Sequence, residues 1–600
     1  MLSIYDYLAI AIYFGLIFAA GVMLRRQSTN TSDYFRAGGG IPWWITGAAL
    51  FMNFSAWTFT GAAGEVYKTG TFVLALYLSN SVGYITVWMW TCRRFRRLRV
   101  ITWMEAVEAR FGRPTQQFYT WVKIPILWLL GGVALYAVAV FMSSVFDVNL
   151  TATLVACGVL VTLVSFFGGA WAVAANDFIQ MFLVMAITLV AAVLALRQPE
   201  VGGIAGLIHR VPKSYFDWTA HTPADVISAW IIAMAIINIL MFNSVENAPK
   251  FLMLRSDREA RRMTLIPIIG ITLAPLLWII PSMTAIVTHP NLHQQFPHLQ
   301  HPSEAAYVSV CLATMPRGMI GLLVSTIFAA TITSMDAVLN QGVGVVVRNF
   351  YLPIVNPQAG EKQLLRISKV TTLVFGVIII AIGMLLGEGS VPGLFTLTNQ
   401  LAASLLMPMT VPLALCLIYL RTPSWSGWST AAVGLIISGI IKLEFPAILP
   451  VLFPGRHGHI TPTESTDALF FVTTFAVVGI GTAWFLFTGL FYRYSSAAHR
   501  ARIDALRANL NTPVREDAAL TGKKNRPLYK VLGTLAAIYG TVICLFTLIP
   551  NRTSGRVGFL FCGAVMLAIG VTMLRKARSA ETAPPLEQDP SDNRPLTESL

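Results

Sequence analysis

The sequence has 600 residues, of which 55% are hydrophobic and only 12% are charged. A soluble chain of this length could not bury so much apolar surface in one core, so lipid must be its main solvent. The formal net charge of +15 would suggest a nucleic-acid partner in a soluble protein. Here the basic residues stand mostly in short loops beside long apolar runs, as the positive-inside rule describes, so we expect a lipid bilayer and no nucleic acid as partner.

Apolar runs along the chain predict fifteen membrane-spanning helices, most of them near the ~20 residues that cross the hydrocarbon. They cover residues 5–24, 43–68, 70–92, 118–146, 150–168, 171–197, 225–247, 264–288, 317–342, 367–387, 394–418, 429–443, 467–491, 531–549 and 557–574. The run at 429–443 is the least convincing. The six cysteines are scattered and form no CxxC or Cys/His cluster, which argues against structural zinc and a disulfide framework. The expected fold class is an all-α integral membrane protein.

The loops between these runs differ in charge, and this difference predicts the orientation. Bases gather in alternate loops, at 25–36, 93–99, 250–262 and 348–369, whereas the opposite loops carry histidines and acids. We therefore expect a multi-pass protein of the plasma or inner membrane, with its N-terminus outside and its C-terminus cytoplasmic. The basic connection 492–530 is expected in the cytoplasm, with a surface helix around 498–508. The Pro-rich polar tail 579–600 is predicted to be disordered.

A polar, small-residue stretch interrupts the second apolar run near mid-membrane. It reads FMNFSAWTFTGAAG over residues 51–64, and Asn53 lies ~15 Å into the run at the helical rise. Broken helices expose backbone carbonyls to ions and substrates at this depth in transporters. The alternative is that these small and polar residues serve helix packing.

Two acidic residues stand inside apolar runs. Translocon scales put an intramembrane Asp at about 2.5–3.5 kcal/mol, so Asp336 should face a partner or a wet cavity. Asp177 and Asp336 each lie about six residues from the cytoplasmic end of their runs, ~9 Å deep. At that matched depth the two carboxylates could share a cation, or each could cap a local helix break independently.

Five segments in order resemble the sodium/solute symporter family, which includes the sodium/glucose, proline, pantothenate and sialic acid transporters. They read SDYFRAGGGIPWW (32–44), NFSAW (53–57), FFGGAWAVAANDFIQ (166–180), KFLMLRSDREARR (250–262) and AATITSMDAVLN (329–340). The resemblance implies an inverted five-plus-five helix core. Its repeats would cover 43–197 and 225–418, after an extra helix within 1–42 and before about four further helices in 429–574. An odd number of helices per repeat makes the second repeat enter from the opposite side.

The resemblance also implies a sodium ion as the coupling ion and places its site. Its ligands would be the carbonyls of Phe51, Phe54 and Ala330 and the hydroxyls of Thr333 and Ser334. Some members bind a second sodium with the Asp that matches Asp177. This chain departs from that pattern, because Asp336 and Ala337 stand where serines are usual. Asp336 could strengthen a second cation site or make it carry a proton, which leaves the stoichiometry open.

Matching by position also implies a substrate pocket at the interface of the repeats. Its residues are Asn53, Trp57, Thr58, Tyr77, Asn80, Asn238, Phe242 and Gln400. Neutral hydrogen-bonding groups and flat aromatic walls suit a small neutral or zwitterionic solute, a sugar or polyol or an amino acid.

The prediction is a sodium-coupled symporter that imports such a solute by alternating access, and not an enzyme. The alternatives are a proton-coupled transporter of the same inverted-repeat architecture or a membrane sensor derived from it. The sequence indicates neither the particular solute nor an oligomeric state.

Overall fold

The computed structural model describes residues 2–24, 41–52, 55–100, 102–167, 170–220, 222–389, 392–454, 460–514 and 518–582. These residues form helices joined by short loops, and no strand occurs among them. Twelve helical segments are long and apolar enough to cross a membrane, and Ile4–Leu16 and Leu150–Leu163 are shorter apolar helices. Each of the fifteen predicted runs coincides with a helical segment. The protein is therefore an all-α, multi-pass membrane protein, as predicted.

The first group of core helices begins with a broken helix. Its elements are α3 (Trp43–Phe51), α4 (Ala56–Phe59), α5 (Gly61–Thr69), α6 (Leu74–Thr86), the π-helical turn Val87–Thr91, α7 (Cys92–Arg97), α8 (Trp103–Phe111), α9 (Arg113–Phe146), α10 (Leu150–Phe167) and α11 (Ala170–Leu196). The chain reverses between α5 and α6 at Gly70, whose φ of 69° is a backbone conformation that favours glycine. This reversal separates two predicted runs, 43–68 and 70–92, although the helical turns between them are nearly continuous.

The second group of core helices packs among the first. It comprises α13 (Ala224–Asn243), α14 (Ala248–Leu252), α15 (Asp257–Met263), α16 (Leu265–Thr288), α18 (Ala306–Thr314), α19 (Met319–Val345), α20 (Glu361–Glu388), α21 (Leu394–Leu401) and α22 (Met407–Leu415). Short helices α12 (Gly203–Arg210) and α17 (Leu292–Gln295) lie in loops. Helix α19 is the most buried of the candidate membrane spans among the described residues, and it contacts α9, α10, α11 and α4. This enclosed helix carries three of the five predicted sodium ligands, Ala330, Thr333 and Ser334.

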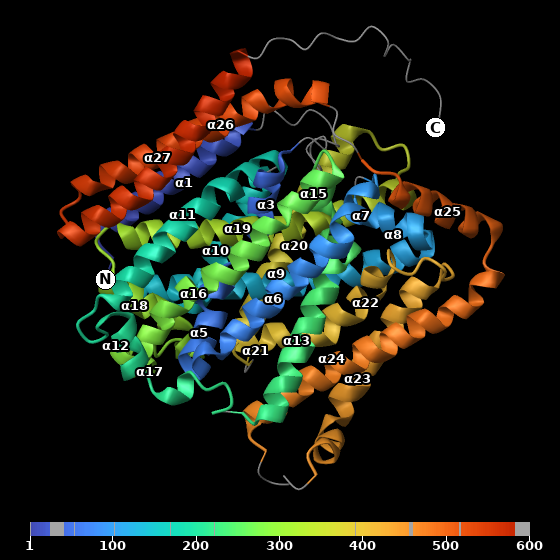
Figure 1. Ribbon diagram of the computed structural model, residues 1–600, viewed down its shortest axis with the longest axis horizontal. Coiled ribbons are helices and arrows are strands. Elements are labelled where there is room, and N and C mark those ends of the chain that lie inside the picture. Colours follow the sequence, from blue (N-terminus) through green and yellow to red (C-terminus); the bar gives the residue numbers. More distant parts are fainter. Residues whose placement is uncertain are drawn as a thin grey trace.

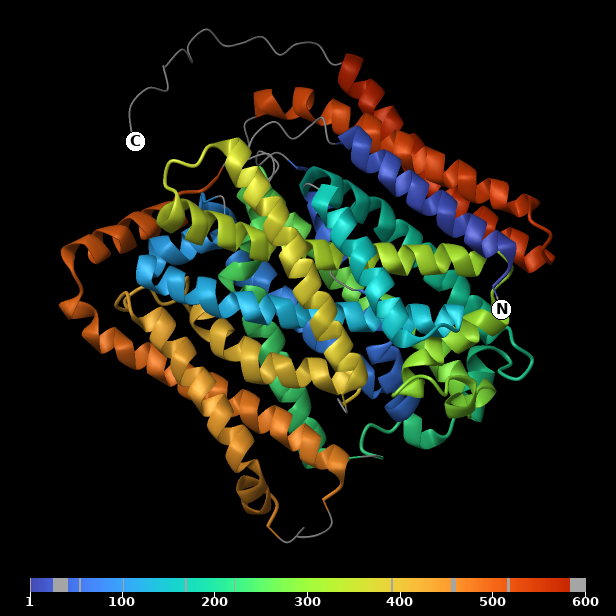
Figure 2. The same cartoon turned by 180° about the vertical axis from the view of Figure 1, so that it is seen from behind.

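Three helices from the two ends of the chain form one edge of the molecule. Helices α26 (Ala518–Leu545) and α27 (Thr553–Thr582) pair closely and lie beside α1 (Ile4–Leu24) along that edge (Figures 1 and 2). Helix α1 is joined to the core by Asp6, whose carboxylate accepts hydrogen bonds from the Gly318 and Gly321 amides at 2.8 and 3.0 Å. An acid at a helix N-terminus satisfies its free amides and favours its dipole. Helix α1 therefore caps α19.

The opposite edge is built from α23 (Ser426–Leu452) and α24 (Pro462–Thr488), which pack on each other and on α22 and α13 (Figure 1). The predicted run 429–443 is thus part of a 27-residue helix, longer than its apolar core suggested. The predicted surface helix is α25 (Ala497–Asn511), which packs on α7 and α8.

Candidate functional site

The break in the first core helix faces the middle of α19. Helix α3 ends at Phe51, and α4 restarts at Ala56 with Ser55 as its N-cap. The restart is held from across the molecule, because Thr331 accepts a hydrogen bond from the Ala56 amide at 2.9 Å. Thr331 in turn donates its own proton to the Ile327 carbonyl at 3.0 Å. Its oxygen thereby satisfies the Ala56 amide, which has no partner within its own helix at the start of α4. Two predicted polar segments, 51–64 and 329–340, are therefore in direct contact.

The described sodium-ligand candidates lie around this contact. Thr333 donates to the Ala329 carbonyl at 3.2 Å and Ser334 donates to the Ala330 carbonyl at 3.1 Å. A hydroxyl that donates its proton backwards into its own helix keeps its lone pairs for a second partner. Phe51 is the last residue of α3 and so lies next to the break. Phe54 lies outside the described residues, as does Asn53 of the substrate set.

Below the hydroxyls, Asp177 of α11 and Asp336 of α19 are buried neighbours. Thr333 is the hydrogen-bonding neighbour of the Asp177 carboxyl, and Asp336 is one of its charged neighbours. Asp336 lies beside Ser165 of α10 and Asn340. One oxygen of each of these two carboxyls and the Ser165 hydroxyl are buried with no hydrogen-bond partner among the described residues. Buried polar atoms are nearly always satisfied, so these oxygens point to a ligand that supplies positive charge or protons.

Lys250 of α14 approaches the same place from the loop after α13. Its ammonium donates a hydrogen bond to the Ala49 carbonyl at the C-terminal end of α3, and Asp177 is its charged neighbour. Burial lowers the pKa of Lys250, and Asp177 acts in the opposite direction. The Lys250 amine thus lies at the carbonyl end of α3, next to Asp177.

The substrate candidates on the restarted helix lie under α21. The indole of Trp57 donates to the Leu394 carbonyl at 3.3 Å, and its ring stacks on Phe395 with centroids 6.1 Å apart. Thr58 is buried and is the hydrogen-bonding neighbour of the Tyr77 hydroxyl. The structure therefore brings Trp57, Thr58 and Tyr77 together.

The remaining candidates lie along α6, α13 and α21. Phe242 stacks on Tyr84 with centroids 4.2 Å apart, and Asn238 bonds the Met234 carbonyl of its own helix at 3.1 Å. Both residues pack against α6 at Gly83, in the second half of that helix, whereas Tyr77 lies near its start. Asn80 and Gln400 are half-buried. Asn238 and Phe242 thus contact α6 at Gly83, six positions beyond Tyr77.

A chain of hydrogen bonds joins the Trp57 group to the loop before α18. Glu304, in the loop turn before α18, accepts from the Leu394 amide at 2.7 Å, while the Leu394 carbonyl accepts from Trp57. The same turn packs closely on α5, where a Cβ added at Gly64 would lie 3.0 Å from the Glu304 backbone. Burial raises the pKa of Glu304 to about 7, and the Leu394 amide and Lys68 oppose that shift. The start of α21 is therefore hydrogen-bonded both to Trp57 of α4 and to Glu304 of the loop before α18.

Several residues of this site were not among the sequence candidates. Thr331, Phe395 and Ser165 are neighbours of predicted residues, and the run of hydroxyls in 329–340 was the only signal for Thr331. Lys250 stood in the basic loop that indicated orientation. Glu304 had no signal, because its partner Leu394 is 90 positions away.

The family of the chain follows from comparison with known proteins. A family model described as the sodium:solute symporter family matches residues 34–427, which include the broken helix, both buried acids and α19. The chain belongs to the sodium:solute symporter family.

Characterised relatives are similar over most of their length. The sodium/glucose cotransporter of Vibrio parahaemolyticus is 22% identical over 420 residues, 64% of this chain and 76% of the relative. The sodium/sialic acid symporter SiaT of Proteus mirabilis is 23% identical over 479 residues, 76% of this chain and 93% of the relative. The solved structure of a substrate-bound, outward-open Na⁺-coupled sialic acid symporter covers 82% of this chain and 98% of its own, at a TM-score of 0.61 and 19% identity. That similarity shows the fold, including its inverted repeats.

Proposed function

We propose that this chain is a sodium-coupled symporter that imports a small neutral or zwitterionic solute by alternating access. The observation that carries the proposal is the group of buried oxygens between α19, α10 and α11 for which the described part of the chain offers no hydrogen-bond partner. They lie directly below the Thr333 hydroxyl and the helix break. Membership of a sodium:solute symporter family supports the same conclusion.

The first sodium site is proposed between the end of α3 and the middle of α19. The carbonyls of Phe51, Phe54 and Ala330 and the hydroxyls of Thr333 and Ser334 would supply five oxygen ligands, the kind that hard cations prefer. The Ser334 hydroxyl donates to the Ala330 carbonyl at 3.1 Å. The Ser334 oxygen therefore keeps its lone pairs for sodium, as the Thr333 oxygen does.

A second cation is proposed at Asp177 and Asp336. Two buried carboxylates repel each other, so at least one of them needs a proton, a metal ion or a fixed cation nearby. Lys250 supplies one positive charge on the α3 side of Asp177. Asp336 has no basic residue among its interacting neighbours in the described chain, which favours sodium or a proton there.

The solute class follows from the charges around the Trp57 group. Lys123 of α9 is bonded to Glu246 at 2.8 Å, and Lys68 interacts with Glu304. Lys250 interacts with Ala49 and Asp177. These three lysines are thus committed to protein groups, whereas Thr58, Tyr77, Asn80 and Gln400 are neutral. A dicarboxylate would be buried without countercharge, so sugars, polyols and zwitterionic amino acids fit best.

Orientation is part of the proposal. The basic loops 93–99, 250–262 and 348–369 would face the cytoplasm of a plasma or inner membrane, with the N-terminus outside and the C-terminus inside. The outer hydrogen-bond chain from Glu304 to Trp57 would then face the side from which the solute enters.

The experiment that tests the proposal is solute uptake into proteoliposomes. A panel of labelled sugars, polyols, amino acids and dicarboxylates is offered under an inward sodium gradient, and again under potassium or a proton gradient. We expect uptake of a neutral or zwitterionic solute only with sodium. Uptake driven by protons without sodium would contradict the coupling, and sodium-driven uptake of a dicarboxylate alone would contradict the solute class.

A further inference from the structure

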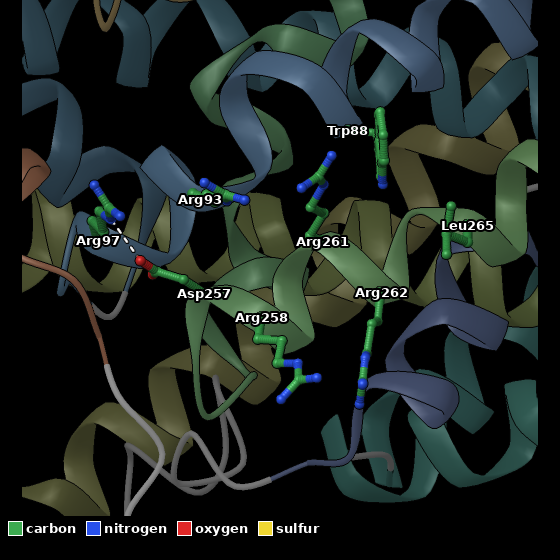
Figure 3. Close-up of a pocket in the computed structure, with 8 residues that line it drawn as sticks. All are labelled: Trp88, Arg93, Arg97, Asp257, Arg258, Arg261, Arg262 and Leu265. Atoms are coloured by element: carbon green, nitrogen blue, oxygen red, sulfur yellow. Dashed lines mark hydrogen bonds and ion pairs between the residues drawn. The ribbon is translucent and has the colours of Figure 1, made fainter.

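A hollow of about 490 Å³ lies at the surface between α7 and α15, outside the transport site. It is lined by Trp88, Arg93, Arg97, Asp257, Arg258, Arg261, Arg262 and Leu265 (Figure 3). Trp88 comes from the π-helical turn after α6, the arginines and Asp257 come from α7 and α15, and Leu265 begins α16. The hollow therefore lies beside two of the basic loops, at the proposed cytoplasmic interface of the membrane. The transport mechanism uses none of them.

The walls of the hollow carry a large excess of positive charge. Five arginines and one aspartate line it, a formal excess of four positive charges. Only Arg97 among the five forms an ion pair within the described part of the chain, with Asp257 at 2.7 Å. Arg93, Arg258 and Arg262 are exposed. The positive-inside rule explains why bases stand on this side, but it does not require several guanidinium groups around one hollow.

The side chains of the hollow are partly held in place. Arg261 lies over the Trp88 ring, 4.0 Å from the ring centroid, a cation–π contact that fixes its guanidinium group. Arg93 extends toward Arg261 beside Trp88, whereas Arg258 and Arg262 leave α15 on the other side (Figure 3). Guanidinium groups bind phosphate by paired hydrogen bonds, so Arg93 and Arg261 form a candidate phosphate clamp.

Two apolar stripes lead from the hollow along the helices that would lie in the membrane. On α6 and the following turn, exposed side chains stand at Leu78, Val82, Ile85 and Met89. On α16 they stand at Leu265, Ile269, Leu273 and Leu276. Both stripes repeat at three- and four-residue steps, so each forms one face of its helix. The Ser81 and Thr272 hydroxyls, 2.9 Å apart, hold the two helices side by side.

We propose that this hollow binds the headgroup of an anionic phospholipid, with its phosphate on Arg93 and Arg261. Its acyl chains would lie along the two apolar stripes of α6 and α16. A soluble phosphate compound would use the arginines alone, whereas a lipid uses the arginines and the stripes together. The continuity of the two features selects the lipid, and basic pockets between helices at the cytoplasmic surface bind such headgroups.

The test is native mass spectrometry of the purified chain, titrated with phosphatidylglycerol or phosphatidylcholine. We expect the wild-type chain to retain phosphatidylglycerol in preference to phosphatidylcholine. The double variant Arg93→Gln with Arg261→Gln should retain about tenfold less phosphatidylglycerol, because each surface arginine contributes measurably to anionic-lipid affinity. The matched control, Lys362→Gln with Arg366→Gln, removes two exposed bases at the start of α20 and should bind like wild type.

Because Arg261 also packs on Trp88, a second pair protects the test against misfolding. Arg93→Gln with Arg258→Gln keeps the Arg261–Trp88 contact and should still reduce phosphatidylglycerol retention several-fold. Equal retention by this pair and the control would overturn the proposal. So would inorganic phosphate that displaces phosphatidylglycerol from the wild-type chain, because that result would mean a soluble anion site.

Discussion

The two ends of the broken helix differ in how their polar groups are satisfied. At the end that we propose faces outward, the outer end, Glu304, the Leu394 amide and carbonyl and the Trp57 indole form a continuous chain of direct hydrogen bonds. At the opposite, inner end, oxygens of Asp177, Asp336 and Ser165 are buried with no hydrogen-bond partner in the described part of the chain. At the outer end, Glu304, Leu394 and Trp57 satisfy one another's hydrogen bonds without a ligand. The inner end keeps carboxyl oxygens that the described residues leave without a hydrogen-bond partner.

This contrast indicates where the driving ion acts. The hydrogen-bonded outer end is stable without a ligand. Breaking its hydrogen bonds would only replace them by hydrogen bonds to water, with little net gain in free energy. An inner end with unsatisfied carboxylates gains free energy when a cation arrives. The predictions below test whether the two ends behave as differently as their hydrogen bonding suggests.

The largest effect is expected from Thr333→Ala with Ser334→Ala. The change removes two of the five proposed sodium ligands, so half-maximal uptake should need at least about tenfold more sodium, since each lost charge-assisted contact costs about 1.5 kcal/mol or more. Sodium-dependent uptake in proteoliposomes measures it. The matched control is Ser325→Ala, which removes a buried hydroxyl bonded one turn back on the same helix. Unchanged sodium dependence in the double variant would refute the site.

The next effect is expected at the acids. Asp177→Asn and Asp336→Ser should each change the number of charges moved per solute or the pH dependence of uptake, because each removes a carboxylate from the second cation site. Solute-induced currents combined with radiolabelled uptake give the ratio. Asp147→Asn changes an exposed residue after α9 and serves as the control. Wild-type ratios and pH profiles in both variants would make the acids structural.

A smaller change of opposite sign is expected at Lys250. Lys250→Gln keeps a donor for the Ala49 carbonyl but removes a positive charge beside Asp177. Less repulsion should lower the half-saturating sodium concentration by about threefold to tenfold, as expected for one partly screened charge. Lys362→Gln at an exposed position should have no effect. A weaker sodium affinity in Lys250→Gln would show that the ammonium supports the site instead of competing with it.

At the outer end, Trp57→Phe should affect the solute and spare sodium. The phenyl ring can still stack on Phe395, but the bond to the Leu394 carbonyl is lost. One neutral hydrogen bond contributes about 1 kcal/mol, so the half-saturating solute concentration should rise about fivefold. The sodium dependence should stay within about twofold of wild type. A larger change in sodium than in solute affinity would contradict the separation of the two ends.

The smallest effect is expected from Glu304→Gln, on stability. Because burial raises the folded-state pKa of Glu304 to about 7, the folded protein holds this proton more tightly than the unfolded chain. Stability should therefore fall as the pH rises from about 5 toward about 7.5. Glutamine keeps an acceptor for the Leu394 amide and removes the titration, so this part of the pH dependence, about 1–3 °C in Tm, should disappear. An equal pH dependence of Tm in the variant and the wild type would refute this role of Glu304.

Much of the architecture was predictable because membrane helices are encoded by local composition. Apolar runs predicted the helices, and the FMNFSAW stretch correctly indicated an interruption before Ala56. The matched depths of Asp177 and Asp336 also pointed to their proximity, since helices crossing one bilayer share a depth scale. The predicted entry segment 32–40, with Asn53 and Phe54, lies outside the described residues, so those assignments stay predictions.

The contacts that the sequence could not indicate are those between distant segments. Thr331 was one hydroxyl among several that could have bonded only its own helix, and its bond to Ala56 spans 275 positions. In the sequence, Lys250 is one of several bases in a loop predicted to be cytoplasmic. Only the fold shows that it lies beside α3. The arginine hollow could not be predicted from the sequence either, because α7 and α15 are far apart along the chain and are in contact only in the folded structure.

The central claim is that the partnerless oxygens of the inner end belong to a sodium-dependent site. The most direct measurement is equilibrium binding of radioactive sodium to the purified protein without solute, competed with potassium. The account predicts saturable sodium binding that potassium does not displace, that is weakened in Asp177→Asn with Asp336→Ser, and that is kept in Ser325→Ala. Sodium binding that is equal in all three proteins, or that potassium displaces equally well, would contradict it.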